Sequence, residues 1–377
     1  MALLFDQIKP VPQLHVLLIA AGGYPYLKDG PNEKDQYFSG AANLGQLTSP
    51  SVSAEEMYTA IIQLHQDNAW ITPLGSIEVL VSNAQQAKPV FDGMTPGNAT
   101  IASINQAYYD WKARCDTHEG NIVLFFFCGH GLEKGEHYLL AEDFGINPNN
   151  PWPQSFSFES TRRAFYSCKA KTQLFFVDAC RYVTSDMLTH DIPLTPLDIP
   201  SFRSTSCKYD LVQKAAAPNE GAYGEINKAS FFTRALTGAL KGNVAEKESG
   251  VWKVGTAKLA GKMNELLGEV MPGQDYPQRC ISSTSDVRDI IQLNGPPQAL
   301  LNVTCDPEQA IAAAELFCKN AKTAKEVKRA PEPQPWNIKV EAGVYSVKAS
   351  FANGAFSDYE EYIPVNPPVT REKIRCV

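Results

Sequence analysis

The chain has 377 residues, of which 44% are hydrophobic and 20% are charged, and its formal net charge is −7. This composition is ordinary for a folded globular protein, and the length suffices for one large and one small domain. The acidic balance argues against an obligate nucleic-acid binder, which would need excess positive charge on its surface.

The sequence shows no signal for a targeting segment or a metal site. The apolar run that begins at Leu14 is too short to span a bilayer and lacks a basic leading region. We therefore expect a cytoplasmic protein without membrane association. Nine scattered cysteines without a C-x-x-C pair argue against both a secreted disulfide framework and a structural zinc site. We predict no metal and no cofactor.

Buried strands are the first elements that the hydrophobic pattern predicts. Each candidate is mostly a continuous apolar run, which suits a sheet covered on both faces. His15 and Glu78 interrupt two of the runs. The candidate strands, in chain order, cover residues 14–20, 77–82, 122–128 and 173–178.

Amphipathic stretches between and after these strands predict helices. Alternation of strand and helix indicates a mostly parallel sheet with right-handed crossovers and helices on both faces. One later helix is expected to end at Gly242, a residue that commonly caps helices. The predicted helices cover residues 53–66, 98–114, 158–168, 227–242 and 251–270.

The remaining segments predict a long loop and a second domain. Residues 182–206 are rich in Pro, Ser and Thr without a clear period, as in a functional or disordered loop. Beyond residue 297 the runs become short and alternating, and Asn353-Gly354 is a hairpin signal. We therefore predict an α/β domain over residues 1–296. A small β-sandwich-like domain, to which we attach no function, is predicted over residues 297–377.

Two of the predicted strands run into reactive residues. One ends in "CGHG" at residues 128–131, and the other ends in "DACR" at residues 178–181. Ligands bind at the carboxyl ends of strands in open parallel sheets, so His130 and Cys180 are expected at the same sheet edge. A thiolate is a strong nucleophile that a nearby imidazolium favours, and histidine can protonate a leaving amine. The pair therefore suits acyl transfer.

Three further residues complete the expected site. The N–H groups of Gly131 and Cys180 are placed to bind a developing oxyanion. Asp178 follows an apolar run, where an unpaired carboxylate is costly, and lies on the same face as Cys180. It suits an Arg or Lys of a bound peptide; the alternative is a carboxylate that braces a neighbouring loop N–H. Glu225 is a second acidic candidate for substrate binding, or otherwise a loop charge.

The paired motifs resemble the caspase-like (clan CD) cysteine peptidases, particularly their bacterial caspase-like and metacaspase branch. The caspase signature is Q-A-C-[RQG]-G with a histidine about 50 residues upstream, and 50 residues separate His130 from Cys180 here. Asp178 replaces the glutamine, as in metacaspases, whose corresponding aspartate selects basic P1 residues. Tyr182 replaces the final glycine. The resemblance covers roughly residues 10–295.

This resemblance implies a caspase-like cysteine endopeptidase that cleaves protein or peptide substrates after Arg or Lys. In that role Cys180 is the nucleophile and His130 the acid/base. Bacterial members of the group serve in defence and regulated cell death and are activated by upstream proteins. Residues 201–214 fall where relatives keep a linker between their large and small parts. Its expected processing sites are Arg203, Lys208 and Lys214, unless the segment is an ordinary charged surface loop.

Other interpretations stay open at this point. A lone cysteine at a strand end is usually a core thiol, and we interpret Cys128 in this way. The chain could be a catalytically silent caspase-fold adaptor that binds a partner protein, although an intact Cys-His pair speaks against this. It could also be a clan CD enzyme of different specificity. Arg181 is expected to pair with a carboxylate, and the remaining histidines, including His137, are expected to be core or surface residues.

Overall fold

The computed structural model describes residues 2–37, 43–84, 89–199, 207–271, 273, 278–352 and 354–377. The chain forms two compact units. The first comprises Met1–Thr237 and Gly255–Ile290, and the second comprises Gly238–Val254 and Ile291–Val377. The second unit thus takes a short segment from the middle of the chain, which the sequence pattern did not indicate. The division into domains at residue 297 stays a prediction.

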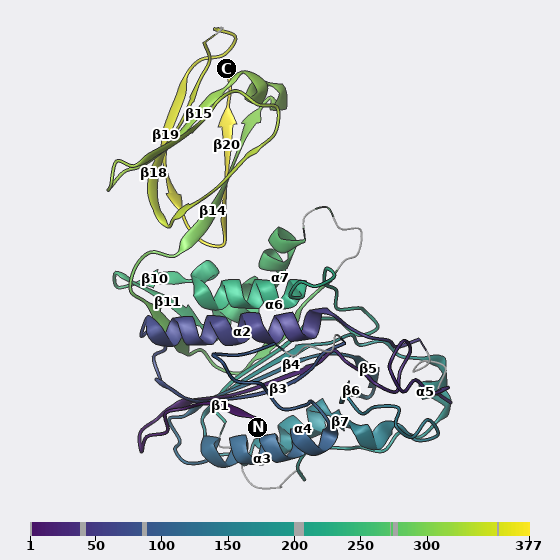
Figure 1. The fold of residues 1–377 in the computed structure, drawn as a ribbon. Coiled ribbons are helices and arrows are strands. Elements are labelled where there is room, and N and C mark those ends of the chain that lie inside the picture. Colours follow the sequence, from purple (N-terminus) through teal and green to yellow (C-terminus); the bar gives the residue numbers. More distant parts are fainter. Residues whose placement is uncertain are drawn as a thin grey trace. The chain divides into compact units, whose positions relative to one another are not determined.

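A seven-stranded sheet forms the centre of the first unit (Figure 1). The five inner strands run parallel, and each edge strand runs antiparallel to its neighbour. The spatial order is β1 (Leu3–Asp6), β3 (Leu74–Ser82), β2 (Leu14–Ala21), β4 (Ile122–Cys128), β8 (Thr172–Asp178), β9 (Tyr209–Lys214) and β12 (Ile281–Thr284).

The four strands predicted from apolar runs are confirmed. Every residue of β2, β3, β4 and β8 is buried, as expected for a sheet with both faces covered. The two polar interruptions have partners: His15 Nδ1 lies 2.8 Å from Ser76 Oγ, and Glu78 forms an ion pair with Arg114. The polar residues therefore fit the core because each one is paired.

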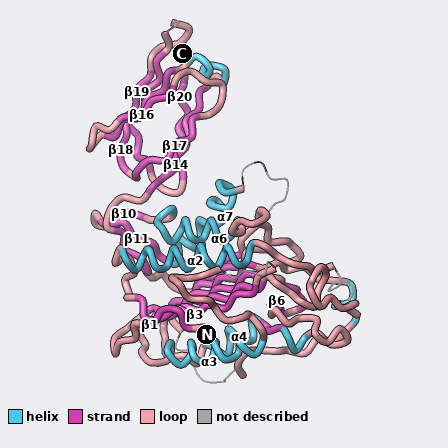
Figure 2. Tube along the Cα trace, in the orientation of Figure 1, coloured by secondary structure: helices cyan, strands magenta, loops and turns pink. Residues whose placement is uncertain are grey.

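Helices lie on both sides of this sheet (Figures 1 and 2). On one side are α2 (Ser49–Gln66), α6 (Phe231–Gly238) and α7 (Thr256–Val270), and on the other are α3 (Ile101–Cys115) and α4 (Phe158–Phe165). α2 and α3 both pack on β2 and β3. The expected mostly parallel α/β fold with two helical layers is confirmed.

Two helix predictions need correction. α2 begins four residues before the predicted serine cap, because Pro50 is tolerated in the first turn, where a backbone N–H has no helical partner. The helix predicted over 251–270 is wrong for its first five residues, which form β11 (Val251–Gly255). They pair with β10 (Glu246–Glu248) through a turn in which Ser249 and Gly250 have φ of 48° and 87°. The valines and tryptophan of this segment suit a strand.

A smaller antiparallel sheet follows the CGHG motif. It consists of β5 (Gly131–Lys134), β6 (Glu136–Leu140) and β7 (Ser155–Ser157), with the short helix η1 (Trp152–Gln154) before β7. Leu132 of β5 also forms an isolated parallel bridge with Tyr182. The predicted loop after β8 contains a short helix, α5 (Ser185–Thr189), and its residues 200–206 lie outside the described part of the chain.

The second unit consists of η2 (Ala239–Asn243), whose Gly242 has the positive φ (110°) expected of a cap, and three β-sheets. One sheet is β10-β11-β13, in which β13 covers Asp289–Leu293. The others are β17-β14-β20 and β16-β15-β18-β19, whose inner faces share one apolar core. Their elements are β14 (Gln298–Asp306), η3 (Glu308–Ala313), β15 (Glu315–Asn320), β16 (Glu326–Arg329), β17 (Trp336–Glu341), β18 (Gly343–Ser350), β19 (Tyr359–Val365) and β20 (Val369–Arg375).

The hairpin predicted at Asn353-Gly354 is present but has a longer connection than a two-residue turn. β18 and β19 pair antiparallel, and residues 351–358 join them. Gly354 has φ of 63°, while Asn353 lies outside the described residues.

Within the described ranges, no helix combines the length and the apolarity that crossing a bilayer requires.

The ion pair between Glu78 and Arg114 gives a test of the core. Glu78→Ala is expected to lower the free energy of unfolding by about 3 kcal/mol, because Arg114 would keep its charge beside a buried strand. Urea unfolding followed by circular dichroism measures this change. As a control, Glu119→Ala removes the 65% exposed partner of Lys171 and should cost far less, because water screens an exposed ion pair. Equal losses in both variants would contradict the interpretation.

Candidate functional site

The pairing of β4 with β8 places the two motifs side by side. These neighbouring parallel strands are in register from Ile122↔Thr172 to Cys128↔Asp178. The chain segments that follow Cys128 and Asp178 therefore leave the sheet at the same edge, where parallel α/β sheets bind ligands. The sequence alone did not show that these two strands are neighbours.

A cavity of about 490 Å³ opens at this edge and brings the predicted residues together. His130 and Cys180 line it along with Asp178. One wall is the segment that leads into α2, and another is the segment between β9 and α6. The full lining is Gln46, Leu47, Thr48, Ser49, Pro50, Cys128, Gly129, His130, Asp178, Cys180, Ala222, Tyr223, Gly224, Glu225, Ile226 and Ser230.

His130 is held on two sides. Its Nε2 lies 2.8 Å from the carbonyl oxygen of Gly45, and its backbone N–H donates to the Tyr24 hydroxyl at 2.9 Å. A carbonyl only accepts, so Nε2 carries the hydrogen and Nδ1 keeps its lone pair. Burial lowers the pKa of His130 from 6.5 to about 4, although the bond to Gly45 offsets part of this effect. The imidazole is therefore neutral at physiological pH.

Cys180 contacts the cavity wall that is formed by the segment between β9 and α6. The N–H of Ala222 lies 3.3 Å from the Cys180 Sγ, and the Ala222 carbonyl oxygen lies 3.7 Å from the same sulfur. Burial raises the pKa of the Cys180 thiol above its usual range, and the Ala222 N–H opposes this shift in part. The resting pair is thus a thiol and a neutral imidazole, rather than the thiolate and imidazolium that the sequence suggested.

Asp178 lines the cavity with only 3% of its surface exposed. Its Oδ2 accepts hydrogen bonds from the hydroxyls of Ser230 and Thr233, the latter at 2.7 Å. Burial raises the pKa of Asp178 from 3.8 to about 6, and these two hydroxyls partly counter the increase. The carboxylate braces side chains rather than a loop N–H, and it still borders the cavity.

The other predicted substrate contact, Glu225, has a different environment. It lines the cavity, but its side chain is 41% exposed and forms ion pairs with Lys228 at 2.8 Å and Arg234 at 3.1 Å. Lys228 is the main cause that lowers the pKa of Glu225. Two cations thus already neutralise this carboxylate.

Arg181 pairs with Glu133 through two hydrogen bonds, at 2.5 and 2.8 Å, which confirms its expected structural role.

The three predicted processing residues differ in accessibility. Arg203 lies outside the described residues. Lys208 is exposed just before β9, and its N–H donates to the Lys171 carbonyl at 2.9 Å. Lys214 is the last residue of β9, is 9% exposed and pairs with Glu159. Lys214 does not suit a processing site, because its backbone belongs to the central sheet rather than to a loop.

Several residues that contact the site were not predicted from the sequence. Gly45 and Tyr24, which hold His130, come from segments far from either motif. His137 was expected to be an ordinary core or surface residue, yet its Nε2 lies 2.9 Å from the carbonyl oxygen of Cys180. These contacts have no spacing signature because they join residues that are distant in sequence. The sequence shows only that His137 lies seven residues after His130, a spacing that indicates no contact with Cys180.

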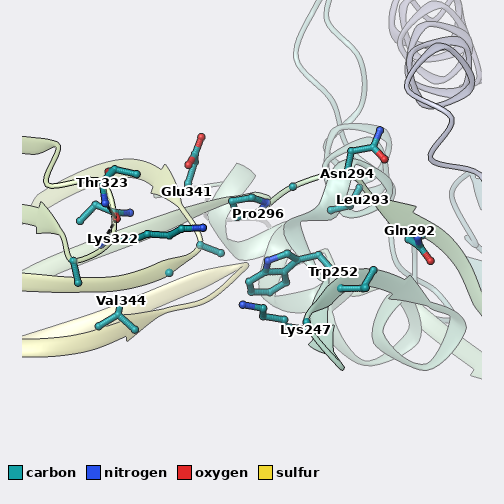
Figure 3. A pocket seen from close by; sticks show the side chains of 17 residues that line it. Lys247, Trp252, Gln292, Leu293, Asn294, Pro296, Lys322, Thr323, Glu341 and Val344 are labelled. Carbon is teal, nitrogen blue, oxygen red and sulfur yellow. Dashed lines mark hydrogen bonds between the residues drawn. The ribbon is translucent and has the colours of Figure 1, made fainter.

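A larger cavity, of about 890 Å³, lies in the second unit (Figure 3). Lys247 and Trp252 line it from β10 and β11, while Lys322 and Glu341 come from the segments at the ends of β15 and β17. Its lining contains neither cysteine nor histidine, so it cannot hold a Cys-His pair.

In the described part of the chain, no group of three or more His, Cys, Asp or Glu side chains could hold a metal ion.

Comparisons with known proteins place the chain in a family. The sequence model of the Caspase domain family, Peptidase_C14, matches residues 44–282. The uncharacterized protein y4kE of Sinorhizobium fredii is 27% identical over 266 residues, which is 68% of this chain and 76% of that protein. Among solved structures, caspase-1 from Spodoptera frugiperda is 12% identical (76% and 94% of the two chains covered, TM-score 0.39). Protein GSU0716 from Geobacter sulfurreducens is also 12% identical (74% and 95% covered, TM-score 0.43).

The family match includes both strand ends and the cavity between them. It begins at residue 44, within the loop that holds His130, and ends at residue 282, in β12. Since it covers more than half of the sequence, the chain belongs to the caspase domain family.

Proposed function

We propose that this protein is a cysteine endopeptidase that cleaves peptide bonds after Arg or Lys. The observation that carries the proposal is the shared cavity of Cys180, His130 and Asp178. It supplies a nucleophile, a base and a buried acidic group at one sheet edge, all lining a volume of about 490 Å³. Membership of the caspase domain family supports the same assignment.

The histidine tautomer favours His130 as the base. Because Nε2–H is bonded to the Gly45 carbonyl, Nδ1 is the nitrogen left to take a proton. In the proposed reaction the Cys180 thiol gives its proton to Nδ1 as Sγ attacks the substrate carbonyl carbon. Burial opposes charge on both groups before substrate arrives, so this transfer coincides with attack.

The remaining steps follow the usual course of acyl transfer. As the tetrahedral intermediate collapses, the C–N bond breaks and the imidazolium returns its proton to the leaving amine. Water then adds to the thioester with His130 again as base, and the release of the carboxylic acid restores the thiol. We assign the binding of the oxyanion, which forms during both acylation and deacylation, to the N–H groups of Gly131 and Cys180.

Selection of a basic P1 residue is assigned to Asp178. A carboxylate that is almost completely enclosed pairs strongly with a guanidinium or ammonium group, because water screens the pair poorly. Ser230 and Thr233 fix its orientation before substrate binds. Lys228 and Arg234 already pair with Glu225, so we assign the P1 charge to Asp178 alone.

A fluorogenic peptide panel with Arg, Lys, Asp or Leu at P1 tests the activity. The unaltered protein is expected to cleave after Arg and Lys. Cys180→Ala should lower kcat/KM by at least about 10³-fold, and His130→Ala should lower it by roughly 10²–10⁴-fold. The matched control is Cys207→Ala, since Cys180 and Cys207 are the two cysteines that are not buried; it should retain activity.

Two outcomes of this panel would reject parts of the proposal. Cleavage after Asp would remove the role assigned to Asp178. Absence of cleavage, together with failure of Cys180 to react selectively with a peptidyl acyloxymethyl ketone, would favour a catalytically silent adaptor that binds a partner protein.

The pH dependence offers a separate test of Asp178. Its pKa is raised to about 6, so the carboxyl becomes neutral as the pH falls through that value. For Arg substrates, kcat/KM should then decline about tenfold per pH unit below 6. Asp178→Asn should abolish this limb and lower kcat/KM by about 30-fold or more at pH 7.5. Asp210→Asn, outside the cavity, is the control; an unchanged pH limb in Asp178→Asn would exclude the assignment.

Self-processing and a place in bacterial defence or cell death, triggered by an upstream protein, remain part of the proposal. We propose Arg203 and Lys208 as the residues after which the protein cleaves itself. Incubation of the purified protein should release fragments with new C-termini at these residues, and Cys180→Ala should release none. Fragment masses decide this point, and N-terminal profiling of a digested proteome with both proteins identifies the substrates. Identical fragments from both would assign the cuts to another protease.

A further inference from the structure

A hydrogen-bond ladder joins the segment around His130 to the segment around Cys180. Gly129 N–H donates to the Asp178 carbonyl at 3.1 Å, and Glu133 N–H donates to the Tyr182 carbonyl at 3.0 Å. Donors and acceptors in a parallel ladder recur every second residue. The same register therefore calls for a bond from Gly131 N–H to the Cys180 carbonyl, midway between the two that are formed.

His137, rather than Gly131, donates a hydrogen bond to the Cys180 carbonyl. Its Nε2 lies 2.9 Å from the Cys180 oxygen, and since a carbonyl only accepts, the imidazole is the donor. His137 is 1% exposed, and its backbone N–H donates to Glu159 at 2.7 Å. Burial lowers the pKa of His137 to about 3, so this donor is a neutral imidazole throughout the working pH range.

The Gly131 N–H is consequently left unused. Leu140 N–H donates to the His130 carbonyl at 3.1 Å, which makes the facing residues Gly131 and Leu139 a pair without mutual hydrogen bonds. Among the backbone hydrogen bonds between described residues outside the strand ladders, none uses the N–H of Gly131 or of Cys180. Within the ladder, the pairing with Leu139 gives the Gly131 N–H no acceptor. These two N–H groups are the donors assigned to the oxyanion.

Glycine at position 131 is required by the same contact. A Cβ there would lie 2.5 Å from the Cys180 oxygen and 2.5 Å from His137 Nε2. The backbone of Gly131 thus packs directly against the imidazole–carbonyl bond without replacing it.

We infer that His137 is a positioning residue: by occupying the Cys180 carbonyl, it keeps the Gly131 N–H out of the ladder and available to the oxyanion. The inference rests on the proposed peptidase function and adds to it. Without this donor, the Cys180 carbonyl would be left unsatisfied, and the donor that the ladder register supplies for it is the Gly131 N–H. The ladder would then close and the oxyanion hole would lose one donor.

Three substitutions at His137 test this. Gln places an amide N–H near the position of Nε2, Asn is too short to do so, and Leu has no donor. His137→Leu and His137→Asn should lower kcat by about 10²-fold or more, as loss of one oxyanion donor does, with KM changed less than threefold. His137→Gln should stay within tenfold of the unaltered protein. The affinity for a peptidyl aldehyde, whose adduct uses the oxyanion hole, should fall in parallel with kcat.

Alkylation separates the oxyanion hole from the nucleophile. Iodoacetamide reacts with Cys180 without forming an oxyanion, so its rate should change less than twofold in all three variants. His15→Leu is the matched control: this histidine is 2% exposed, with one side-chain hydrogen bond far along β2, and its loss should leave kcat unchanged. Melting temperatures report folding of each variant.

The outcomes are distinct from those that test the proposed function. Normal kcat in His137→Leu, equal loss in His137→Gln, or an alkylation rate that falls along with kcat would overturn the role of His137 while leaving the peptidase intact. Absence of peptide cleavage and of selective Cys180 modification in the unaltered protein would instead remove the proposed function itself.

Discussion

The register between β4 and β8 is the constraint on which the site depends. Seven consecutive residue pairs, ending at Cys128↔Asp178, fix where each chain leaves the sheet. Aromatic side chains on these strands hold the register, with the Phe125 and Phe175 rings 5.8 Å apart. A slip by one residue would turn every side chain to the opposite face and bury the wrong set. The cost of that change ties the placement of His130 and Cys180 to the packing of the core.

A second feature of the site is that its two reactive groups, His130 and Cys180, are uncharged before substrate binds, and that Asp178 is bound by neutral hydroxyls. A carbonyl holds His130, a backbone N–H contacts the Cys180 sulfur, and two hydroxyls orient Asp178. Burial disfavours the charged form of each of the three side chains. Charge on His130 and Cys180 therefore arises only with the proton transfer, in an environment whose dipoles are already oriented. Asp178, with a pKa of about 6, is already ionised at neutral pH.

The sequence predicted the elements whose signal is local, and less of what depends on contacts between distant segments. Continuous apolar runs located β2, β3, β4 and β8 within three residues of their observed ends. β11 was mistaken for helix because Val251–Gly255 is short and apolar, and a run of that kind has no decisive period.

Around the site the same division holds. The motifs at 128–131 and 178–181 pointed to His130 and Cys180, but the pairing that brings them together came only with the structure. Neither the carbonyl of Gly45 nor the imidazole of His137 could be foreseen, because a backbone acceptor leaves no trace in residue identity and a histidine in a strand has many ordinary explanations. The neutral resting state was likewise missed, since burial of a side chain depends on the whole fold.

The adjacency of β8 and β9 has a consequence for how the molecule tolerates a cut. Six register pairs, from Thr172↔Tyr209 to Val177↔Lys214, join these strands, and β9 is also paired with β12 on its other side. A cut between them would therefore leave two pieces that still share one sheet, and what the cut removes is mainly the entropic advantage of a closed loop. A single nick there would yield two polypeptides on a denaturing gel but one particle of unchanged mass in solution.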